Sequence, residues 1–357
     1  MATQLRIKDG KKWEFKGKIV VDSNGRLVKG KSENWELVGY TGRKPKGKLV
    51  ILEGVTEIGG WAFKGCTGLT SVEIPSSVTE IYQNAFEDCT GLASVVIPAG
   101  VTRIDAWAFL GCTGLKSIEI PSSVTRIGGG AFKGCTGLTS VEIPPSVTKI
   151  GRHAFYDCTG LTSIEIPLSV TEIDPTAFEG CSHLQEIHVD ENNCVYSSKN
   201  GLLLDKEGVT LVRVPAGLAS VVIPAGVTRI GEDAFSGCTG LTSVEIPSSV
   251  TEIGKHAFSR CTGLTTLEIP SSVTEIGAGA FSGCTGLTSV EIPPSVTKIG
   301  RHAFYDCTGL TSIEIPLSVT EIGGGRLMVV CIFRKFMWMR IIASIHQKMG
   351  YYSIRKE

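Results

Sequence analysis

The sequence of 357 residues lacks the segments by which proteins usually enter or cross a membrane. Its first fifteen residues, MATQLRIKDGKKWEF, contain no apolar stretch of the kind that a secretory signal needs. The most apolar segment, residues 327–345, is interrupted by Arg334, Lys335 and Arg340, whereas a membrane-spanning helix needs about 20 mostly apolar residues. No Asn-X-Ser/Thr glycosylation site occurs. We therefore expect no membrane span, and these absences taken alone favour a cytoplasmic protein.

The sequence also lacks the motifs that commonly carry catalysis or bind metal ions. It contains no H-E-x-x-H, G-x-S-x-G or Walker loop, and the glycine run at residues 128–130 lacks the G-x-G-x-x-G spacing. The cysteines form no C-x-x-C pair of the kind that zinc sites use. His153, His256 and His302 share one variable repeat position, which favours a structural role. We expect no catalytic residue, no metal site and no cofactor, and a protein that is not an enzyme.

The absence of net charge conceals three segments of different sign. Residues 1–48 contain 13 basic and 5 acidic side chains, residues 49–325 contain 15 and 29, and residues 326–357 contain 7 and 1. Such an asymmetry can mark an interaction surface. A basic N-terminal cap on an acidic body explains the first two segments equally well.

The dominant feature of the chain is an internal repeat. Cysteine recurs every 23 residues from position 66 to 181 and again from 238 to 307, and phenylalanine precedes each of these cysteines by three positions. Self-similarity at a fixed period is typical of proteins in which each unit packs only on its neighbours. The sequence therefore predicts a solenoid over residues 49–325 instead of two or three globular domains.

A single repeat, residues 66–88, predicts how one coil is built. Apolar and polar residues alternate at the period of a strand until Pro75, which cannot donate to a strand ladder and should end it. Ala85 and Phe86 should lie on a short helical turn. Because one coil cannot bury its apolar side chains alone, stacked coils should each add one parallel strand, about 4.8 Å from the previous one. The side chains expected to be buried are Leu69, Val72, Ile74, Val78, Ile81, Phe86 and Cys89.

The unit C-x-x-L-x-x-[VI]-x-I-P-x-x-V-x-x-I-x-x-x-A-F-x-x resembles the BspA-like subclass of leucine-rich repeats over residues 49–325. The resemblance implies a right-handed leucine-rich-repeat solenoid with one parallel strand per coil and a short helical or irregular convex side. Residues 190–224 interrupt the period and resemble the irregular insert common in that family. Its members are typically surface or secreted proteins that adhere to host proteins or to other cells, so the resemblance implies such a location and role.

The N-terminal segment, residues 1–48, should form a small β-rich cap. Residues 19–21 and 26–28 flank Asp22-Ser23-Asn24-Gly25, a spacing that predicts a hairpin. Trp13, Trp35 and Tyr40 could cover the open end of the first coil. Terminal caps of this kind keep repeat arrays soluble.

Eight glutamates provide the strongest functional signal because they occupy one outward strand position. Val96 and His188 replace glutamate in two other coils. Stacking would place neighbouring carboxylates about 5 Å apart, where they repel by roughly 1 kcal/mol per pair in water before screening. A cationic partner would relieve this repulsion, although duplication of a solvated glutamate explains any single one. The candidate partner-binding residues are Glu73, Glu119, Glu142, Glu165, Glu245, Glu268, Glu291 and Glu314.

We therefore expect a non-enzymatic interaction or adhesion scaffold that binds a basic or polar protein, such as a host protein, through this strand-lined face. Nucleic acid is not an expected partner. One alternative is a structural protein that self-associates end to end through exposed strand edges. Another is the truncated product of a frameshifted gene.

The frameshift hypothesis comes from an internal duplication. Residues 134–173 and 283–322 are identical, but the copy breaks off at residue 326. The codons of residues 326–357 can also be read in a shifted frame, in which each new codon consists of the last base of one codon and the first two bases of the next. In that frame they can encode residues 177–208 at 30 of 32 positions. We interpret residues 326–357 as an out-of-frame tail and not as a designed fold.

Sequencing of the gene across codons 320–330 and downstream tests this interpretation. We expect the bases after codon 325 to encode residues 177–208 in the shifted frame. If the gene has no shift of frame at this point, further repeats follow. If the shift is confirmed, the product is truncated. Bases that cannot encode that copy in any frame would contradict the hypothesis.

Overall fold

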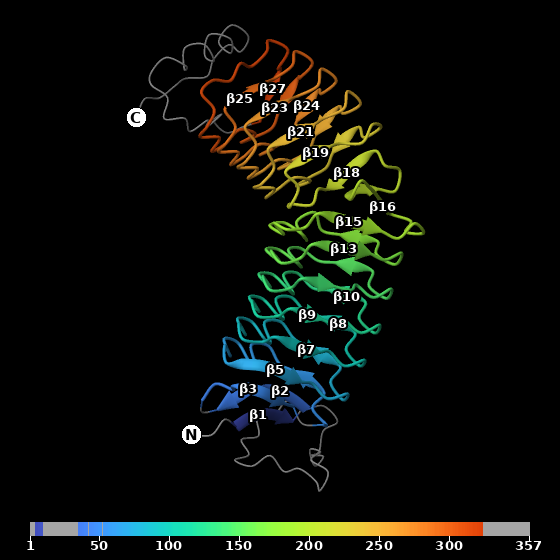
Figure 1. The fold of residues 1–357 in the computed structure, drawn as a ribbon, viewed down its shortest axis with the longest axis vertical. Helices are drawn as coiled ribbons and strands as arrows, with labels where there is room; N and C mark the ends of the chain where they lie inside the picture. Colours follow the sequence, from blue (N-terminus) through green and yellow to red (C-terminus); the bar gives the residue numbers. More distant parts are fainter. Residues whose placement is uncertain (1–3, 10–34, 42, 52, 324–357) are drawn as a thin grey trace. The chain divides into compact units, whose positions relative to one another are not determined.

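The computed structural model describes residues 4–9, 35–41, 43–51 and 53–323, and the chain divides into two compact units. Unit 1 comprises residues 1–207 with 215–217, and unit 2 comprises residues 208–214 with 218–357. Each unit is a β-solenoid of stacked coils with parallel strands, and none of the described residues lies in a helix (Figure 1). The solenoid of stacked coils with parallel strands that the repeat predicted is confirmed.

One side of each coil, called side I below, carries short strands that mostly end in a buried isoleucine. The strands of side I pair in parallel from coil to coil, and β1 adds to β2 antiparallel. In unit 1 they are β1 (Gln4–Asp9), β2 (Trp35–Thr41), β4 (Glu57–Ile58), β6 (Glu80–Ile81), β8 (Arg103–Ile104), β10 (Arg126–Ile127), β12 (Lys149–Ile150) and β14 (Glu172–Ile173). In unit 2 they are β18 (Thr210–Arg213), β20 (Arg229–Ile230), β22 (Glu252–Ile253), β24 (Glu275–Ile276), β26 (Lys298–Ile299) and β27 (Glu321–Ile322).

The other strand-bearing side, side II, contains the strands that the repeat predicted. The alternation is as expected, since Val72 is buried in β5 between the outward Ser71 and Glu73. In unit 1 these strands are β3 (Gly47–Val50), β5 (Leu69–Glu73), β7 (Ser94–Val96), β9 (Ser117–Ile118), β11 (Ser140–Val141), β13 (Ser163–Ile166) and β15 (Glu186–Val189). In unit 2 they are β19 (Ser220–Val222), β21 (Ser243–Glu245), β23 (Thr266–Glu268) and β25 (Ser289–Glu291).

Consecutive turns occupy the place where we expected a short helical turn. The amides of Ala85 and Glu87 donate to carbonyls three residues earlier in the same coil, at 3.3 and 3.2 Å. The amide of Phe86 between them donates 2.8 Å to the carbonyl of Ala108 in the next coil. Because alternate amides are used between coils, the segment cannot form the continuous i to i−4 bonds of an α-helix. Asn84 and Asp88 adopt positive φ angles of 59° and 57° here, which explains why glycine and aspartate recur at the Asp88 position.

The irregular insert in unit 1 is anchored by one buried asparagine. It contains an antiparallel hairpin of β16 (Tyr196–Lys199) and β17 (Leu202–Asp205). The Asn193 amide nitrogen donates to the carbonyls of Pro167 and Val170, each at 2.9 Å, and its oxygen accepts from the amides of Val195 and Tyr196. Every polar atom of this side chain is thereby bonded, so the hairpin is fixed to the preceding coil. The hairpin expected at residues 19–28 and the tail at residues 326–357 lie outside the described residues.

A ladder of stacked phenylalanines fills the core of each unit. Neighbouring rings in unit 1, from Phe63 to Phe178, have centroids 5.3 to 5.6 Å apart and interplanar angles of 4° to 15°. In unit 2, from Phe235 to Phe304, the separations are 4.5 to 5.3 Å. Each such pair is worth about 0.5–1.5 kcal/mol beyond the apolar area that it buries. The ladder therefore ties each coil to the next through its largest side chain.

The cysteines form a second ladder beside the rings. The thiol of Cys135 donates to the carbonyl of Phe109 in the preceding coil at 3.2 Å, and most of the other repeat cysteines make the same bond at 3.0 to 3.2 Å. The eleven cysteines among the described residues are thiols outside any disulfide, and Cys194 is the exposed one of them. Burial raises the pKa of the Cys135 thiol to about 12. The repeat cysteines thus pack as small apolar side chains that bridge coils.

We predict that the ladder thiols are unreactive until the solenoid unfolds. A Cys331→Ser variant removes the one cysteine outside the described residues. At pH 8 a pKa of about 12 leaves about one thiol in ten thousand ionised, and only the thiolate reacts. An aromatic disulfide reagent should react with Cys194 alone in the native variant and with all eleven thiols in denaturant. A second fast-reacting thiol in the native protein would contradict the burial of the ladder.

We also predict that truncation of one rung of the ring ladder is severe. Phe132 is fully buried between two stacked neighbours. Phe132→Ala should lower the free energy of unfolding by about 3–5 kcal/mol, measured by denaturant titration. Val96→Ala, at a side chain that is 63% exposed, is the control and should change it by less than about 0.5 kcal/mol. Equal effects of the two substitutions would show that the ladder does not hold the coils together.

Candidate functional site

The eight candidate glutamates all lie on side II and are all exposed, as their strand position predicted. They are called the acidic column below: Glu73, Glu119, Glu142 and Glu165 in unit 1, and Glu245, Glu268, Glu291 and Glu314 in unit 2. Each follows a buried valine, leucine or isoleucine in its coil, or the half-buried Val244 in the coil of Glu245. The buried neighbour fixes the direction of the glutamate, because successive side chains of a strand point to opposite faces.

Parallel pairing places acidic-column residues next to each other without offset. Glu268 and Glu291 are register partners in β23 and β25. Val96 stands between Glu73 and Glu119, and His188 is the partner of Glu165. The column therefore consists of three consecutive carboxylates in unit 1 and four in unit 2, with Glu73 separate. Neighbours about 5 Å apart repel by about 1 kcal/mol per pair in water, and salt reduces this.

Few basic side chains offset the charge of this column. Lys48 lies 2.7 Å from Glu73, and both side chains are about 60% exposed. Within the part of the chain that the structure describes, none of the other seven acidic-column glutamates forms an ion pair. His188, beside Glu165, is engaged by Glu186 at 3.1 Å. The consecutive carboxylates are thus exposed, aligned and uncompensated by these residues.

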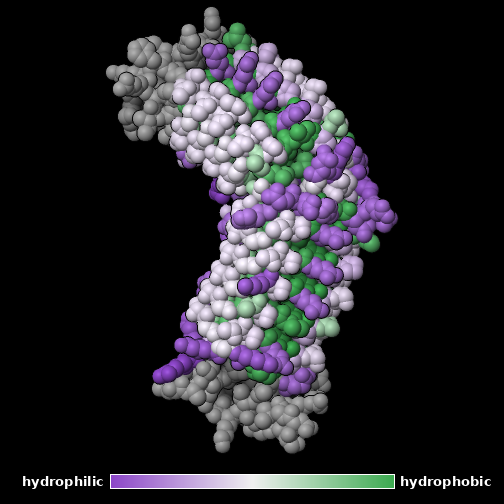
Figure 2. All heavy atoms as spheres, in the orientation of Figure 1, coloured by the Kyte–Doolittle hydropathy of each residue, from purple (hydrophilic) through white to green (hydrophobic). Residues whose placement is uncertain are grey.

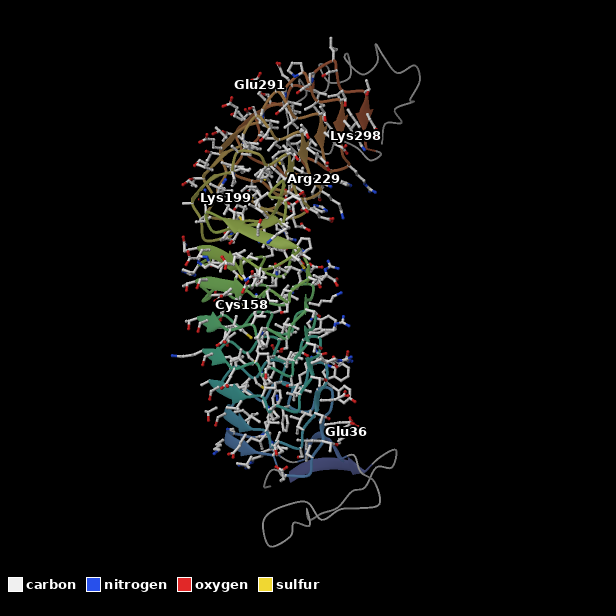
Figure 3. All side chains as sticks on the ribbon, turned by 90° about the vertical axis from the view of Figure 1, so that its right-hand side faces the viewer. Glu36, Cys158, Lys199, Arg229, Glu291 and Lys298 are labelled. Carbon is white, nitrogen blue, oxygen red and sulfur yellow. The ribbon has the colours of Figure 1, made fainter. Side chains whose placement is uncertain are left out.

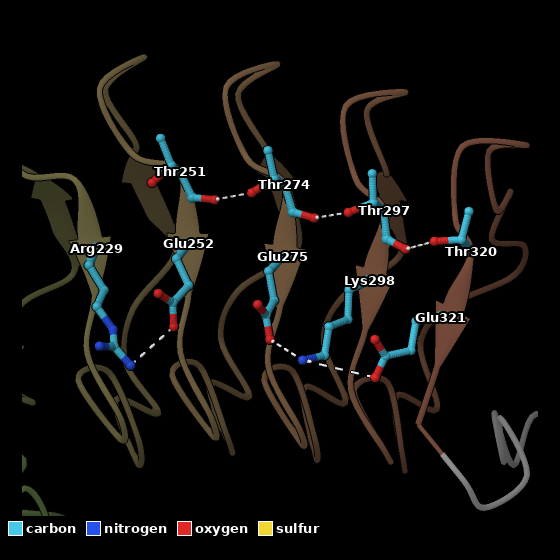
Figure 4. A network of polar contacts seen from close by, with 9 residues as sticks. All are labelled: Arg229, Thr251, Glu252, Thr274, Glu275, Thr297, Lys298, Thr320 and Glu321. Atoms are coloured by element: carbon cyan, nitrogen blue, oxygen red, sulfur yellow. Dashed lines mark hydrogen bonds and ion pairs between the residues drawn. The ribbon is translucent and has the colours of Figure 1, made fainter.

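Side I has the opposite arrangement, which the sequence reasoning did not identify. Its outward position holds charges of both signs, although some neighbours are alike, as Arg103 and Arg126 are. Lys298 lies 3.0 Å from Glu275 and 3.9 Å from Glu321, while Arg229 lies 3.0 Å from Glu252 (Figure 4). Threonines run beside these charges, and Thr274, Thr297 and Thr320 each donate the side-chain hydroxyl to the threonine carbonyl of the preceding coil at 3.3 Å (Figure 4). Alignment of the repeats at the residue before each side I isoleucine would have revealed that both signs of charge occur there. Several charges of side I are therefore paired between coils, whereas Glu73 alone in the acidic column forms an ion pair among the described residues.

The two strand-bearing sides face in different directions. Glu291 of side II and Lys298 of side I belong to the same coil and point to opposite sides of it (Figure 3). In Figure 2, hydrophilic side chains recur at intervals beside a strip of hydrophobic ones within each unit. A partner that approaches side II would therefore meet the acidic column without meeting the ion pairs of side I.

Exposed apolar side chains accompany the acidic column. Val96 and Val222 occupy the column position itself and are 63% and 59% exposed. Leu168 and Leu317 follow the strand-ending proline of their coils and are 50% and 67% exposed. The corresponding position in other coils holds serine, alanine or proline. Comparison of repeats at this position would have singled out the two leucines, but the sequence reasoning followed charge alone.

The turn segments carry a third group of exposed side chains. Trp61 and Trp107 adopt positive φ angles of 58° and 57° and are 52% and 44% exposed. A Cβ added at Gly130 would come within 2.4 Å of the Trp107 ring, so this indole covers the next coil. His153, at the equivalent position, packs edge-on against Tyr156 with ring centroids 5.0 Å apart. Partial burial, and then the charges of Arg152 and Lys133, lower the pKa of His153. These contacts give the turn aromatics a packing role.

No cluster of three or more histidine, cysteine or acidic side chains suited to a metal ion occurs among the described residues. Across the same residues, no helix is long and apolar enough to span a bilayer.

Comparisons with known proteins agree with the observed repeat. Residues 45–135, 111–200 and 215–327 match the model of the BspA type leucine rich repeat region, in six copies. The chain is similar to the crystal structure of a leucine rich cell surface protein from Faecalibacterium prausnitzii A2-165, with 31% identity over 88% of this chain and 96% of that chain, and a TM-score of 0.64. The pneumococcal vaccine antigen PcpA is similar in fold alone, with 19% identity over 86% of this chain and 93% of that chain, and a TM-score of 0.55. No curated protein sequence matches.

We predict that the acidic column does not contribute to stability. Glu291→Gln removes a charge that repels its register partner Glu268, so the free energy of unfolding should stay the same or rise by less than about 1 kcal/mol. Lys298→Gln, in the same coil, removes two exposed ion pairs on side I and should lower it slightly. Denaturant titration at low salt measures both. A clear loss of stability in Glu291→Gln would identify the column as a structural element.

Proposed function

Since this chain belongs to the BspA-type leucine-rich repeat family, we propose that it is a non-enzymatic protein-binding scaffold whose acidic column takes cationic side chains of a partner. The family and its repeat support the coarser role of a protein-interaction scaffold. The choice of side II as the binding face, and of a basic partner, is specific to the residues of this chain.

The observation that carries the proposal is the contrast between the two strand-bearing sides. Side I places lysine or arginine next to glutamate and forms ion pairs of about 3 Å. Side II repeats glutamate in consecutive coils, and those seven carboxylates have no ion-pair partner among the described residues. The same solenoid can therefore pair charges of neighbouring coils, as at Glu252 and Glu275, and the seven carboxylates of side II are left without such pairs among the described residues.

Electrostatic complementarity would act chiefly on encounter and specificity. A row of carboxylates raises the local concentration of a cationic partner and speeds its association, and it disfavours acidic partners. Lysine or arginine side chains placed between neighbouring glutamates would also remove the repulsion within the column. Exposed apolar residues such as Val96 and Val222 would add contact area at the same face.

The proposal includes adhesion at a cell surface. The similar protein from Faecalibacterium prausnitzii is described as a cell surface protein. On that basis we propose that this chain also acts outside the cell, where a basic protein of a host or of another cell would be its partner. End-to-end self-association remains an alternative prediction, and light scattering at rising protein concentration would distinguish it from a monomeric binder.

Selection of peptides from a phage-displayed random library on the immobilised chain tests the proposal. We expect the enriched peptides to contain lysine or arginine beside apolar residues, and their affinity to fall about tenfold or more as salt screens the contacts. The test variant replaces seven glutamates by glutamine, at Glu119, Glu142, Glu165, Glu245, Glu268, Glu291 and Glu314. It should lose the enriched peptides.

A matched control removes the same number of negative charges from outside the acidic column. It replaces by glutamine Glu57, Glu80, Glu172, Glu232, Glu252, Glu275 and Glu321. This control should retain binding, provided that circular dichroism shows both variants folded. The proposal would be contradicted if the selected peptides were not enriched in lysine or arginine, or if the two variants bound the peptides equally.

A further inference from the structure

The internal duplication places the same stretch of surface in both units. Residues 134–173 lie within unit 1 and the identical residues 283–322 lie within unit 2. Each stretch spans nearly two coils and contributes two consecutive acidic-column glutamates. Any site built from these residues alone must therefore occur twice in the chain.

The two copies share the hydrogen bonds that stack their coils. Ser169 donates its hydroxyl to the carbonyl of Val147 at 2.7 Å, and Ser318 makes the equivalent bond to Val296 at 2.9 Å. The threonine ladder matches as well, with Thr171 bonded to Thr148 and Thr320 to Thr297, each at 2.9 Å. Adjacent coils therefore stack in the same register in both copies, and the copies differ in that residues 163–166 form β13 whereas residues 312–315 form no strand.

Each copy combines charge with an exposed apolar side chain on side II. Glu165 and Leu168 are three positions apart, and so are Glu314 and Leu317. Both glutamates are exposed, and the leucines are 50% and 67% exposed. The two groups are called the twin sites below: Glu142, Pro145, Glu165 and Leu168 in unit 1, and Glu291, Pro294, Glu314 and Leu317 in unit 2.

Folding does not require leucine at this position. The equivalent residue is a serine at Ser76, Ser122 and Ser271, in coils with the same turn after the strand-ending proline. Complete burial of a leucine side chain contributes about 1.5–3 kcal/mol, and an exposed leucine leaves much of this unrealised. An exposed apolar group beside uncompensated carboxylates is the combination that an interface with a basic partner uses, because apolar contact supplies affinity and charge supplies specificity.

We propose that the chain is bivalent, with twin sites that each bind a partner segment containing a cationic side chain next to an apolar one. This inference rests on the proposed function and specifies its site and its stoichiometry. The partner best suited to two equal sites carries many copies of this segment, as a polymer or a densely covered surface does. When the geometry allows one partner to bind both sites at once, its apparent affinity can rise by a factor of about 10²–10⁴.

Calorimetric titration of the full chain with one basic peptide from the library selection tests the inference. The wild type should bind two peptides per chain. Glu165→Gln with Leu168→Ser should leave one binding site, and Glu314→Gln with Leu317→Ser should also leave one. All four substitutions together should abolish binding. Serine is the residue that other coils carry at this position, so the variants should fold, and circular dichroism checks this.

The control removes charge from the other side of the same two coils. Glu172→Gln with Glu321→Gln should keep two sites, because both residues belong to side I. A wild-type stoichiometry of one, or one peptide for every acidic coil, would overturn the twin sites while leaving the acidic face in place. Unchanged binding by the variant with all four substitutions would overturn the twin sites, and if the seven-glutamine variant also kept binding, the proposed function would fall as well.

Discussion

The stacking of each coil on its neighbours is the constraint on which the rest of this structure depends. A two-residue strand such as Glu80–Ile81 has too few hydrogen bonds to be stable alone, and one coil encloses no core. Stacked rings about 5.3 Å apart, thiol bonds to the preceding carbonyl and parallel strand pairing all link one coil to the next. Because all three links act between coils, the 23-residue period must be kept nearly constant within each unit.

That constraint also determines what the surface can present. The neighbours of a residue in the two adjacent coils occupy the same repeat position. Residues at any outward position therefore form a column along the stacked coils. Side I reduces the repulsion of like charges where a cation stands between two glutamates, as at Glu275, Lys298 and Glu321. Side II keeps glutamate in consecutive coils and leaves Glu268 directly opposite Glu291. The fold tolerates this repulsion because both side chains are exposed to water, which screens their interaction.

Duplication multiplies this effect. A copied segment of solenoid can stack in the same register as the original, so it carries not only the core residues but also the complete surface of its coils. Leu168 and Leu317 illustrate this, since both remain exposed in equivalent turns although other coils have serine there. A repeat protein can thus acquire a second copy of a binding surface without any change in how the coils pack on one another. This is the physical basis of the proposed bivalency.

The sequence by itself determined the repeat, the buried positions and the outward direction of the acidic column. The 23-residue spacing of Cys and Phe and the alternation around Val72 were sufficient, because each coil repeats the same local pattern. Only the tertiary structure decided the turn segment, where amides such as that of Phe86 bond to the next coil and so prevent a helix. It also showed that Lys298 serves two carboxylates on side I and that the register partner of Glu268 is Glu291. These are contacts between residues 22 or 23 positions apart, and their geometry depends on how the coils stack, which no local pattern specifies.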